Sequence, residues 1–344
     1  MKKKLLALML VTVMAVAATA CGSQQPAAQP DQPDQAASTG DVADEGESSG
    51  GYRIGFAFYN LQNPVWAEVV EEAVSHGTAL GLDVTFVDAA NSAQQISQME
   101  NFIQSGVDAI VVLAVDNESI EGVAREAMDE GIMVVDYSRS IENAHVTLNL
   151  NPFANAVAIV AMAEPFIRDR YGDGEFEWAH LDIPTVEVGV LQGNAIEAEM
   201  LRVFPNSRLV FNGATLTTEE GMNNTEAAIQ ANPNLRVILS QSAGGGVGGN
   251  EAIKAAVSPD EYDEWLLFSI DATEQEVVNI LAGDPQKASI SLGGGAEHGR
   301  LLIDLALRVL AGERFEGDDR IVPLPPTPIT IENAQAFFDE AFGS

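Results

Sequence analysis

The residues of this sequence most suited to chemistry follow its first strand-like apolar run, which ends at Tyr59. Tyr59 and Asn60 are followed by Asn63 and, three residues later, by Trp66. Amides donate and accept hydrogen bonds at once and an indole ring offers a broad apolar face, so this set is suited to holding a hydroxylated ring. Structural alternatives are open for all four residues. Asn63 could cap the following helix and Trp66 could fill the core, while Tyr59 and Asn60 could form a turn.

Two further candidates lie near the ends of later apolar runs. Asp271 follows the run 264–270. The spacing of Thr273 and Glu276 fits a capping box that starts the next helix by itself, which leaves the carboxylate of Asp271 available for a ligand. Tyr137 ends an earlier run and either faces the same site or packs against a helix.

The elements that would position these residues alternate between strand-like and helix-like patterns. Strands are predicted at 52–59, 83–88, 109–115, 132–137, 145–150, 186–192, 208–213, 236–241, 264–270, 287–292 and 320–324. Helices are predicted at 64–80, 93–105, 118–130, 153–168, 219–231, 249–257, 274–282, 297–311 and 331–342.

Continuous apolar runs such as AIVVLAV at 109–115 are typical of parallel strands that are covered on both faces. Repeated βα units in a chain of this length predict an α/β fold with two doubly wound parallel-sheet lobes. Segment 171–185 is rich in glycine, acids and aromatic residues and breaks the alternation. It is predicted to be a surface insertion in the second lobe.

The start of the chain is typical of an exported protein. Three lysines precede an apolar stretch, and a small-residue cleavage site precedes Cys21. This predicts a signal peptide over 1–20, with a buried N-terminal helix as the alternative. Segment 21–51 contains no aromatic residue, lysine or arginine, so it is predicted to be a disordered tether.

The composition argues against several classes of function. A net charge of −34 repels nucleic acid, so no DNA or RNA partner is expected. The four histidines are scattered and Cys21 is the only cysteine, which predicts no metal site and no intramolecular disulfide. The sequence contains no GxSxG motif, no Cys–His pair and no GK[ST] motif, so it is not expected to be an enzyme.

One glycine-rich pattern needs separate treatment. Gly244, Gly246 and Gly249, with Asp271 further on, match a dinucleotide-binding fingerprint in form. The pattern falls late in an exported chain and not in a first βαβ unit, so no cofactor is predicted. Crowding of the backbone near a ligand or hinge explains the glycines as well.

Several segments together resemble the type I periplasmic sugar-binding proteins, the ribose- and xylose-binding family. YNLQNPVW at 59–66 resembles the family's first-strand elbow. NSAQQISQ at 91–98, followed by IQSGVDAI at 103–110, resembles its second helix and third strand. GIMVVDYSR at 131–139 matches the strand that usually ends in Asp-Arg, and VGVLQG at 188–193 and LFSID at 267–271 resemble the strands that open later βα units.

The resemblance covers about 52–325 and implies two lobes joined by a three-crossover hinge. Lobe 1 would be 52–150 plus 293–322, and lobe 2 would be 151–292 plus 323–344. In the family a sugar or polyol is clamped between the lobes by hinge closure, and the monomeric receptor then passes it to an ABC permease.

The segment before Cys21 also resembles a bacterial lipobox, with Ala18 where leucine is usual. This implies lipid attachment at Cys21, which would anchor an exported protein on the outer face of the cytoplasmic membrane. The anchor would not cross the membrane.

The resemblance assigns further ligand contacts. Arg139 aligns with the family's ligand arginine, and Asn151 aligns with an asparagine at the first crossing into the second lobe. Ser138 stands where the family usually has an aspartate, and Gln241 and Ser242 stand where it usually has Asn-Asp. All five residues are candidates for contact with the ligand.

Two more departures concern the second lobe and the hinge. Segment 194–205 lacks an arginine that the family carries and offers Glu197 as a candidate, and Leu292 sits where glutamine is common. These changes put simple ribose or xylose in doubt. The open functions are an uptake receptor for a sugar or polyol, a receptor of the same fold for a nucleoside or a sugar-derived signalling molecule, and an exported enzyme or sensor-only domain.

Overall fold

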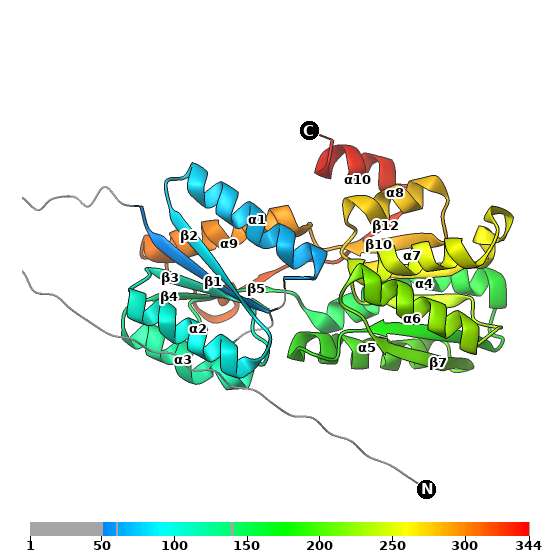
Figure 1. Cartoon of the computed structure of the whole chain (residues 1–344), viewed down its shortest axis with the longest axis horizontal. Helices are drawn as coiled ribbons and strands as arrows, with labels where there is room; N and C mark the ends of the chain where they lie inside the picture. Colours follow the sequence, from blue (N-terminus) through cyan, green and yellow to red (C-terminus); the bar gives the residue numbers. More distant parts are fainter. Residues whose placement is uncertain (1–50, 60, 139–140, 344) are drawn as a thin grey trace, which may run out of the picture. The chain divides into compact units, whose positions relative to one another are not determined.

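The computed structural model describes residues 51–59, 61–138 and 141–343, which form two α/β lobes, each built on a six-stranded sheet (Figure 1). The first lobe contains the sheet β11-β5-β4-β3-β1-β2, in which every pair of neighbours is parallel. Its strands are β1 (Arg53–Tyr59), β2 (Asp83–Ala89), β3 (Ala109–Val112), β4 (Met133–Ser138), β5 (Val146–Asn149) and β11 (Ile321–Pro323).

Helices cover both faces of this first sheet, as a parallel sheet requires. On one face α1 (Pro64–Ala79) packs against α9 (Gly295–Leu310), and on the other α2 (Ser92–Ser105) packs against α3 (Asn117–Asp129) (Figure 1). Successive side chains of β1 point to opposite faces, so Phe56 and Ala57 enter separate apolar cores.

The second lobe contains the sheet β12-β10-β9-β8-β6-β7. Its neighbours are parallel except for β12, which runs antiparallel to β10. The strands are β6 (Phe176–Asp182), β7 (Ser207–Ala214), β8 (Val237–Ser240), β9 (Leu266–Ile270), β10 (Gln286–Ser291) and β12 (Thr327–Thr330).

Two pairs of helices pack over the second sheet. One pair is α4 (Pro152–Tyr171) with α5 (Glu187–Val203), and the other is α6 (Thr218–Ala231) with α7 (Ala243–Ala256) (Figure 1). Helix α8 (Glu274–Ala282) packs against β10, and α10 (Ala334–Ala341) packs on α8. Short 3₁₀ turns occupy Pro259–Glu264 and Gly317–Arg320. The fold is therefore the predicted pair of doubly wound lobes.

The prediction for 171–192 is wrong. The segment read as a surface insertion contains β6, which lies between β7 and β8 in the second sheet, and the segment read as a strand at 186–192 belongs to α5. FEWAHLD mixes polar and apolar residues and lacks the continuous apolar run of its neighbours. The buried residues of α5 instead recur at helical spacing, at Gly189, Gln192, Gly193, Ile196 and Met200.

The glycine-rich segment also differs from its prediction, because α7 begins at Ala243 and not at 249. Its glycines serve the close packing of α6 on α7. A Cβ atom on Gly244 would lie 2.3 Å from the carbonyl oxygen of Leu216, and one on Gly248 would lie 2.2 Å from that of Thr218. Crowding is therefore the reason for these glycines. At Gly244 and Gly248 it comes from α6 and its preceding loop, and at Gly246 from the side chains of Glu276 and Ser269, not from a ligand or a hinge.

The chain passes between the two sheets three times. It passes from β5 to α4 through Leu150 and Asn151, and from β10 to α9 through Leu292, Gly293 and Gly294. The third passage, 324–326, separates β11 from β12. Strand β12 was not predicted, because its sequence TPIT contains a proline and only one buried residue.

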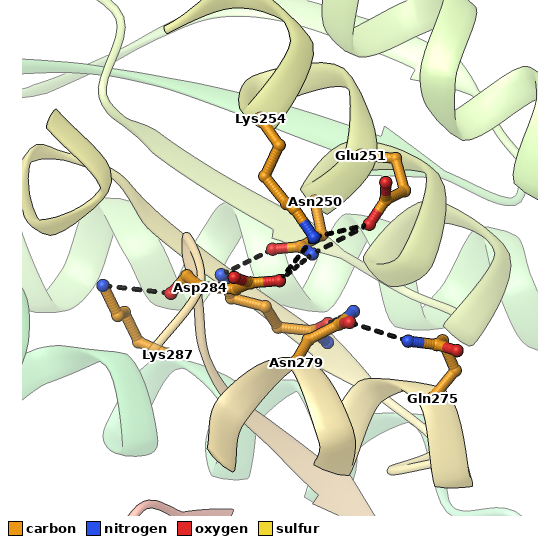
Figure 2. Close-up of polar contacts among 8 residues, drawn as sticks. Asn250, Glu251, Lys254, Gln275, Asn279, Asp284 and Lys287 are labelled. Atoms are coloured by element: carbon orange, nitrogen blue, oxygen red, sulfur yellow. Dashed lines mark hydrogen bonds and ion pairs between the residues drawn. The ribbon is translucent and has the colours of Figure 1, made fainter. Parts of the chain in front are cut away.

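A buried polar cluster holds α7, α8 and the start of β10 together in the second lobe (Figure 2). The side-chain oxygen of Asn250 accepts a hydrogen bond from the backbone N–H of Gln286 at 3.1 Å, and its nitrogen donates to Asp284 at 3.0 Å. Lys254 also donates to Asp284 at 2.8 Å. A buried carboxylate next to a buried backbone amide needs these partners, because neither is solvated by water.

We expect Asn250→Ala to lower the free energy of unfolding by about 2–4 kcal/mol, because it leaves the N–H of Gln286 and the carboxylate of Asp284 under-satisfied. Urea denaturation followed by circular dichroism measures this change. Asn223→Ala is the matched control, since Asn223 is exposed on α6 and lies outside the cluster. Equal losses in the two variants would contradict the role given to Asn250.

Candidate ligand-binding site

A cavity that is partly open to solvent lies at the carboxyl ends of the strands and draws its walls from both lobes. This is where ligands bind in open α/β sheets. The lining residues are Asn63, Val65, Trp66, Tyr137, Leu150, Asn155, Ile183, Val186, Val188, Gly189, Gln192, Gln241, Ile270, Asp271, Leu292 and His298.

The start of α1 supplies the first wall. Asn63 is the N-cap of this helix, and its side-chain oxygen accepts the N–H of Val65 at 2.9 Å. Pro64 follows at the first helical position, where a missing N–H costs nothing. The indole of Trp66 meets the ring of Tyr59 edge-on, with 5.7 Å between centroids. Asn63 therefore caps the helix and also lines the cavity, so a role as helix cap and a role in ligand contact are compatible.

Tyr137 and His298 form a second polar pair. The phenol oxygen of Tyr137 lies 2.7 Å from Nδ1 of His298, and Nε2 of His298 lies 2.7 Å from the carbonyl oxygen of Leu292. A carbonyl only accepts, so Nε2 carries the proton, Nδ1 accepts, and Tyr137 donates. Burial lowers the pKa of His298 to about 4, which keeps the ring neutral at pH 7. The oxygen of Tyr137 is left as an acceptor toward the cavity.

Asp271 brings a carboxylate to the cavity. Its backbone has a φ of 115°, which few non-glycine residues adopt, and one carboxylate oxygen accepts the N–H of Ala243 at 3.0 Å. Burial, followed by repulsion from Glu276, raises the pKa of Asp271 well above its usual range, against the lowering effect of the bond from Ala243. A ligand hydroxyl that donates to this carboxylate would relieve part of its desolvation.

A chain of amides forms the polar wall of the second lobe. Asn155 donates from Nδ2 to the carbonyl of Leu150 at 2.7 Å and to Gln192 at 3.0 Å. Gln192 donates to Gln241 at 3.4 Å, and Gln241 in turn donates to Asp182. Asn155 is 1% exposed, yet its side-chain oxygen has no hydrogen-bond partner among the described residues. Such an oxygen is costly to leave unpaired, so it points to a ligand donor.

The predicted residues fall into three groups. Asn63, Trp66, Tyr137, Gln241 and Asp271 line the cavity.

Five others lie outside its lining, namely Tyr59, Ser138, Asn151, Glu197 and Ser242. Each has a contact within the protein. Asn151 and Ser242 cap α4 and α7, with Asn151 at a φ of 40°. Glu197 contacts His180 and Asn212, and Ser138 donates to Asp136 at 2.7 Å. Asn60, Arg139 and the lipidation candidate Cys21 lie outside the described residues.

Three polar lining residues were missed, namely Asn155, Gln192 and His298. Asn155 lies one helical turn after Asn151, so the i,i+4 spacing on α4 is the signal that could have found it. Gln192 was hidden by the strand prediction for 186–192. His298 gave no signal, because a lone histidine in a helix is most often part of the core.

Glu187, at the first turn of α5, joins the two lobes beside the cavity. Its carboxylate accepts the N–H of Asn117 at 3.0 Å, and its own N–H donates to the carbonyl of Val115 at 3.1 Å. Val115 lies in the loop between β3 and α3 of the first lobe, and Asn117 is the first residue of α3. These contacts hold the lobes together on one side of the cavity.

We expect Glu187→Ala to weaken ligand binding about fivefold, since it removes one hydrogen bond that closes the lobes. Isothermal titration calorimetry measures the effect. Glu199→Ala is the control, because Glu199 pairs with Arg202 within α5. Unchanged affinity in Glu187→Ala would show that this contact does not stabilise the bound state.

Two features are absent from the described part of the chain. Within 51–59, 61–138 and 141–343, no group of three or more histidine, cysteine, aspartate or glutamate side chains is placed to hold a metal ion. The helices of the same residues are all too short or too polar to cross a bilayer.

Comparison with known proteins places this fold and site in a family. A family model described as a periplasmic binding protein domain matches residues 54–314. The ribose import binding protein RbsB of Bacillus subtilis (strain 168) is 25% identical over 271 residues, which cover 77% of this chain and 84% of that protein.

Two solved structures show the same fold. One is an ABC transporter solute binding protein from Bacillus halodurans C-125 with bound myo-inositol (TM-score 0.72, 20% identity, 85% of this chain and 98% of that one). The other is the binding protein of the arabinose ABC transporter from Shewanella sp. ANA-3, bound to α- and β-L-arabinofuranose (TM-score 0.71, 20% identity, 85% and 96%). This chain belongs to the periplasmic binding protein family, and it is a solute-binding protein, not an enzyme.

Proposed function

We propose that this protein is the extracytoplasmic receptor of an ABC importer and captures a sugar or sugar-like polyol between its two lobes. The observation that carries this proposal is the unpartnered, buried side-chain oxygen of Asn155, a residue that lines the same cavity as Asp271 and Tyr137. Three acceptors around one cavity call for a ligand with several hydroxyl donors, and Trp66 supplies a flat apolar surface for its ring.

The relatives support the same class of ligand. The similar proteins are named for ribose import and arabinose transport, and a third holds myo-inositol. Asn60 and Arg139 stay proposed ligand contacts, because the sequence resembles the family there and because Asn60 follows the first strand and Arg139 the fourth. Export, lipid attachment at Cys21, a monomeric state and delivery to a membrane permease complete the proposal.

Native mass spectrometry of the purified protein, followed by calorimetry with the ligand it identifies, tests this function. A co-purified pentose, hexose or polyol that binds with a Kd near micromolar supports the proposal. Such a Kd corresponds to a binding free energy of about −8 kcal/mol. A thermal-shift panel of sugars, polyols and nucleosides is the companion experiment. Stabilisation by nucleosides alone would contradict the sugar assignment.

A further inference from the structure

The described lining of the cavity has more apolar than polar side chains, and most of the apolar ones are aliphatic. Trp66 is its only tryptophan, and most other apolar lining is branched aliphatic. These side chains are Val65, Leu150, Ile183, Val186, Val188, Ile270 and Leu292. The rim of a sugar ring carries hydroxyl groups, and each hydroxyl placed against an aliphatic wall loses its hydrogen bonds to water.

Most polar groups of the lining are already used within the protein. His298 is engaged at both ring nitrogens, and both hydrogens of the Asn155 amide are donated. Gln241 accepts from Gln192 and donates to Asp182. Among the described lining residues, the side-chain groups left for a ligand include the oxygens of Asn155, Asp271 and Tyr137 and the amide nitrogen of Asn63. Together with the proposed contacts from Asn60 and Arg139, they would bind the polar side of a ligand and leave the aliphatic wall for its apolar side.

At the start of α5, an apolar residue of the cavity wall occupies a position where a capping side chain is usual. Val186 is the N-cap of the helix and makes no side-chain cap hydrogen bond, although Ser, Thr, Asp and Asn are preferred there. Its side chain is 3% exposed and lines the cavity together with Ile183 and Val188. A valine at this position gives up the cap hydrogen bond and adds apolar surface to the core and to the cavity wall.

We propose that the ligand is an amphipathic sugar or polyol, with a small apolar substituent such as a methyl or short alkyl group held against Ile183, Val186 and Val188. This rests on the proposed function and narrows its substrate class. The hydroxyl groups face Asn155, Asp271 and Tyr137, and the substituent replaces a hydroxyl that the aliphatic wall cannot satisfy.

Calorimetry on matched pairs of compounds tests the proposal. The pairs are D-ribose with 5-deoxy-D-ribose and with methyl β-D-ribofuranoside, L-arabinose with methyl α-L-arabinofuranoside, and myo-inositol with its mono-O-methyl ethers. At least one substituted compound is expected to bind about fourfold or more tightly than its parent, the gain from burying one methyl group. Parents that bind as tightly as all their derivatives would overturn the inference and leave the proposed function intact. If neither the parent compounds nor the substituted compounds bind, both this inference and the proposed function are contradicted.

Two isosteric variants locate the substituent. Val188→Thr places a hydroxyl on the wall and is expected to reduce binding of the substituted compound at least about fourfold, while its parent changes less than about twofold. Val190→Thr is the control, because Val190 lies on the same helix but is 39% exposed and outside the cavity lining. Equal losses for parent and derivative in Val188→Thr would contradict the assignment of this wall to the substituent.

Discussion

Replacing Asp271 by asparagine is expected to lower ligand affinity about 10- to 100-fold, because a hydrogen bond to a charged acceptor becomes one to a neutral acceptor. Asparagine keeps the size of the side chain and tolerates the φ of 115°, so the fold should survive. Calorimetry at a pH above the raised pKa of Asp271, where the carboxylate is ionised, measures the loss. Asp284→Asn is the matched control, since that carboxylate pairs with Lys254 away from the cavity and its loss should change stability alone.

The same variant makes a prediction for pH dependence. Because the folded-state pKa of Asp271 is raised, its contribution to stability is present below the unfolded value of about 3.9 and is lost as pH rises through the folded value. Asp271→Asn should therefore be more stable than the unliganded wild type at neutral pH and not at low pH. Wild-type affinity should rise over the same interval as the carboxylate ionises, and a flat profile would contradict this.

Trp66→Ala is expected to weaken binding about 100-fold, because it removes the largest apolar surface of the first wall. The change also opens a void beside Tyr59 and should cost a few kcal/mol of stability. Fluorescence titration or calorimetry below the unfolding temperature gives the affinity.

A variant of a second tryptophan separates the effect of Trp66→Ala on affinity from its effect on stability. Trp265 is 2% exposed and contacts Arg236 in the second lobe, outside the cavity lining. Trp265→Ala should lose comparable stability while its affinity stays within about twofold of the wild type. If the two variants lost affinity equally, Trp66 would have no specific part in the site.

The fold could be predicted from the sequence wherever burial was complete. Strands such as β3 and β8 are buried along their whole length, so their apolar runs were visible without any partner. Strand β6 was missed because it carries Glu177, His180 and Asp182, whose partners come from β7, α5 and the loop after β8. A polar residue in a strand is understandable only once its partner is known.

The site shows the same limit. Asn63 and Trp66 could be found because the cap, the proline and the ring lie in one short stretch at the end of a strand. Asn155 could not be found, because its role depends on distant residues. Its nitrogen donates to Leu150 and Gln192, while its oxygen has no partner among the described residues. Asn151 and Ser242 were chosen as candidates and the structure places them as helix caps, which the same sequence pattern fits equally well.

The three passages between the lobes differ in stiffness, which has a consequence for motion. Gly293 and Gly294 have φ values of 111° and 80° and no side chains to restrict rotation, whereas 324–326 contains two consecutive prolines with fixed φ. The passage at Asn151 is fixed by the hydrogen bond between its N–H and the side chain of Asn149 at 3.0 Å. Backbone rotation should therefore concentrate at the glycine pair. The proline and asparagine passages would move least, so the screw axis of closure would run near them. The lobes would then twist as they approach each other.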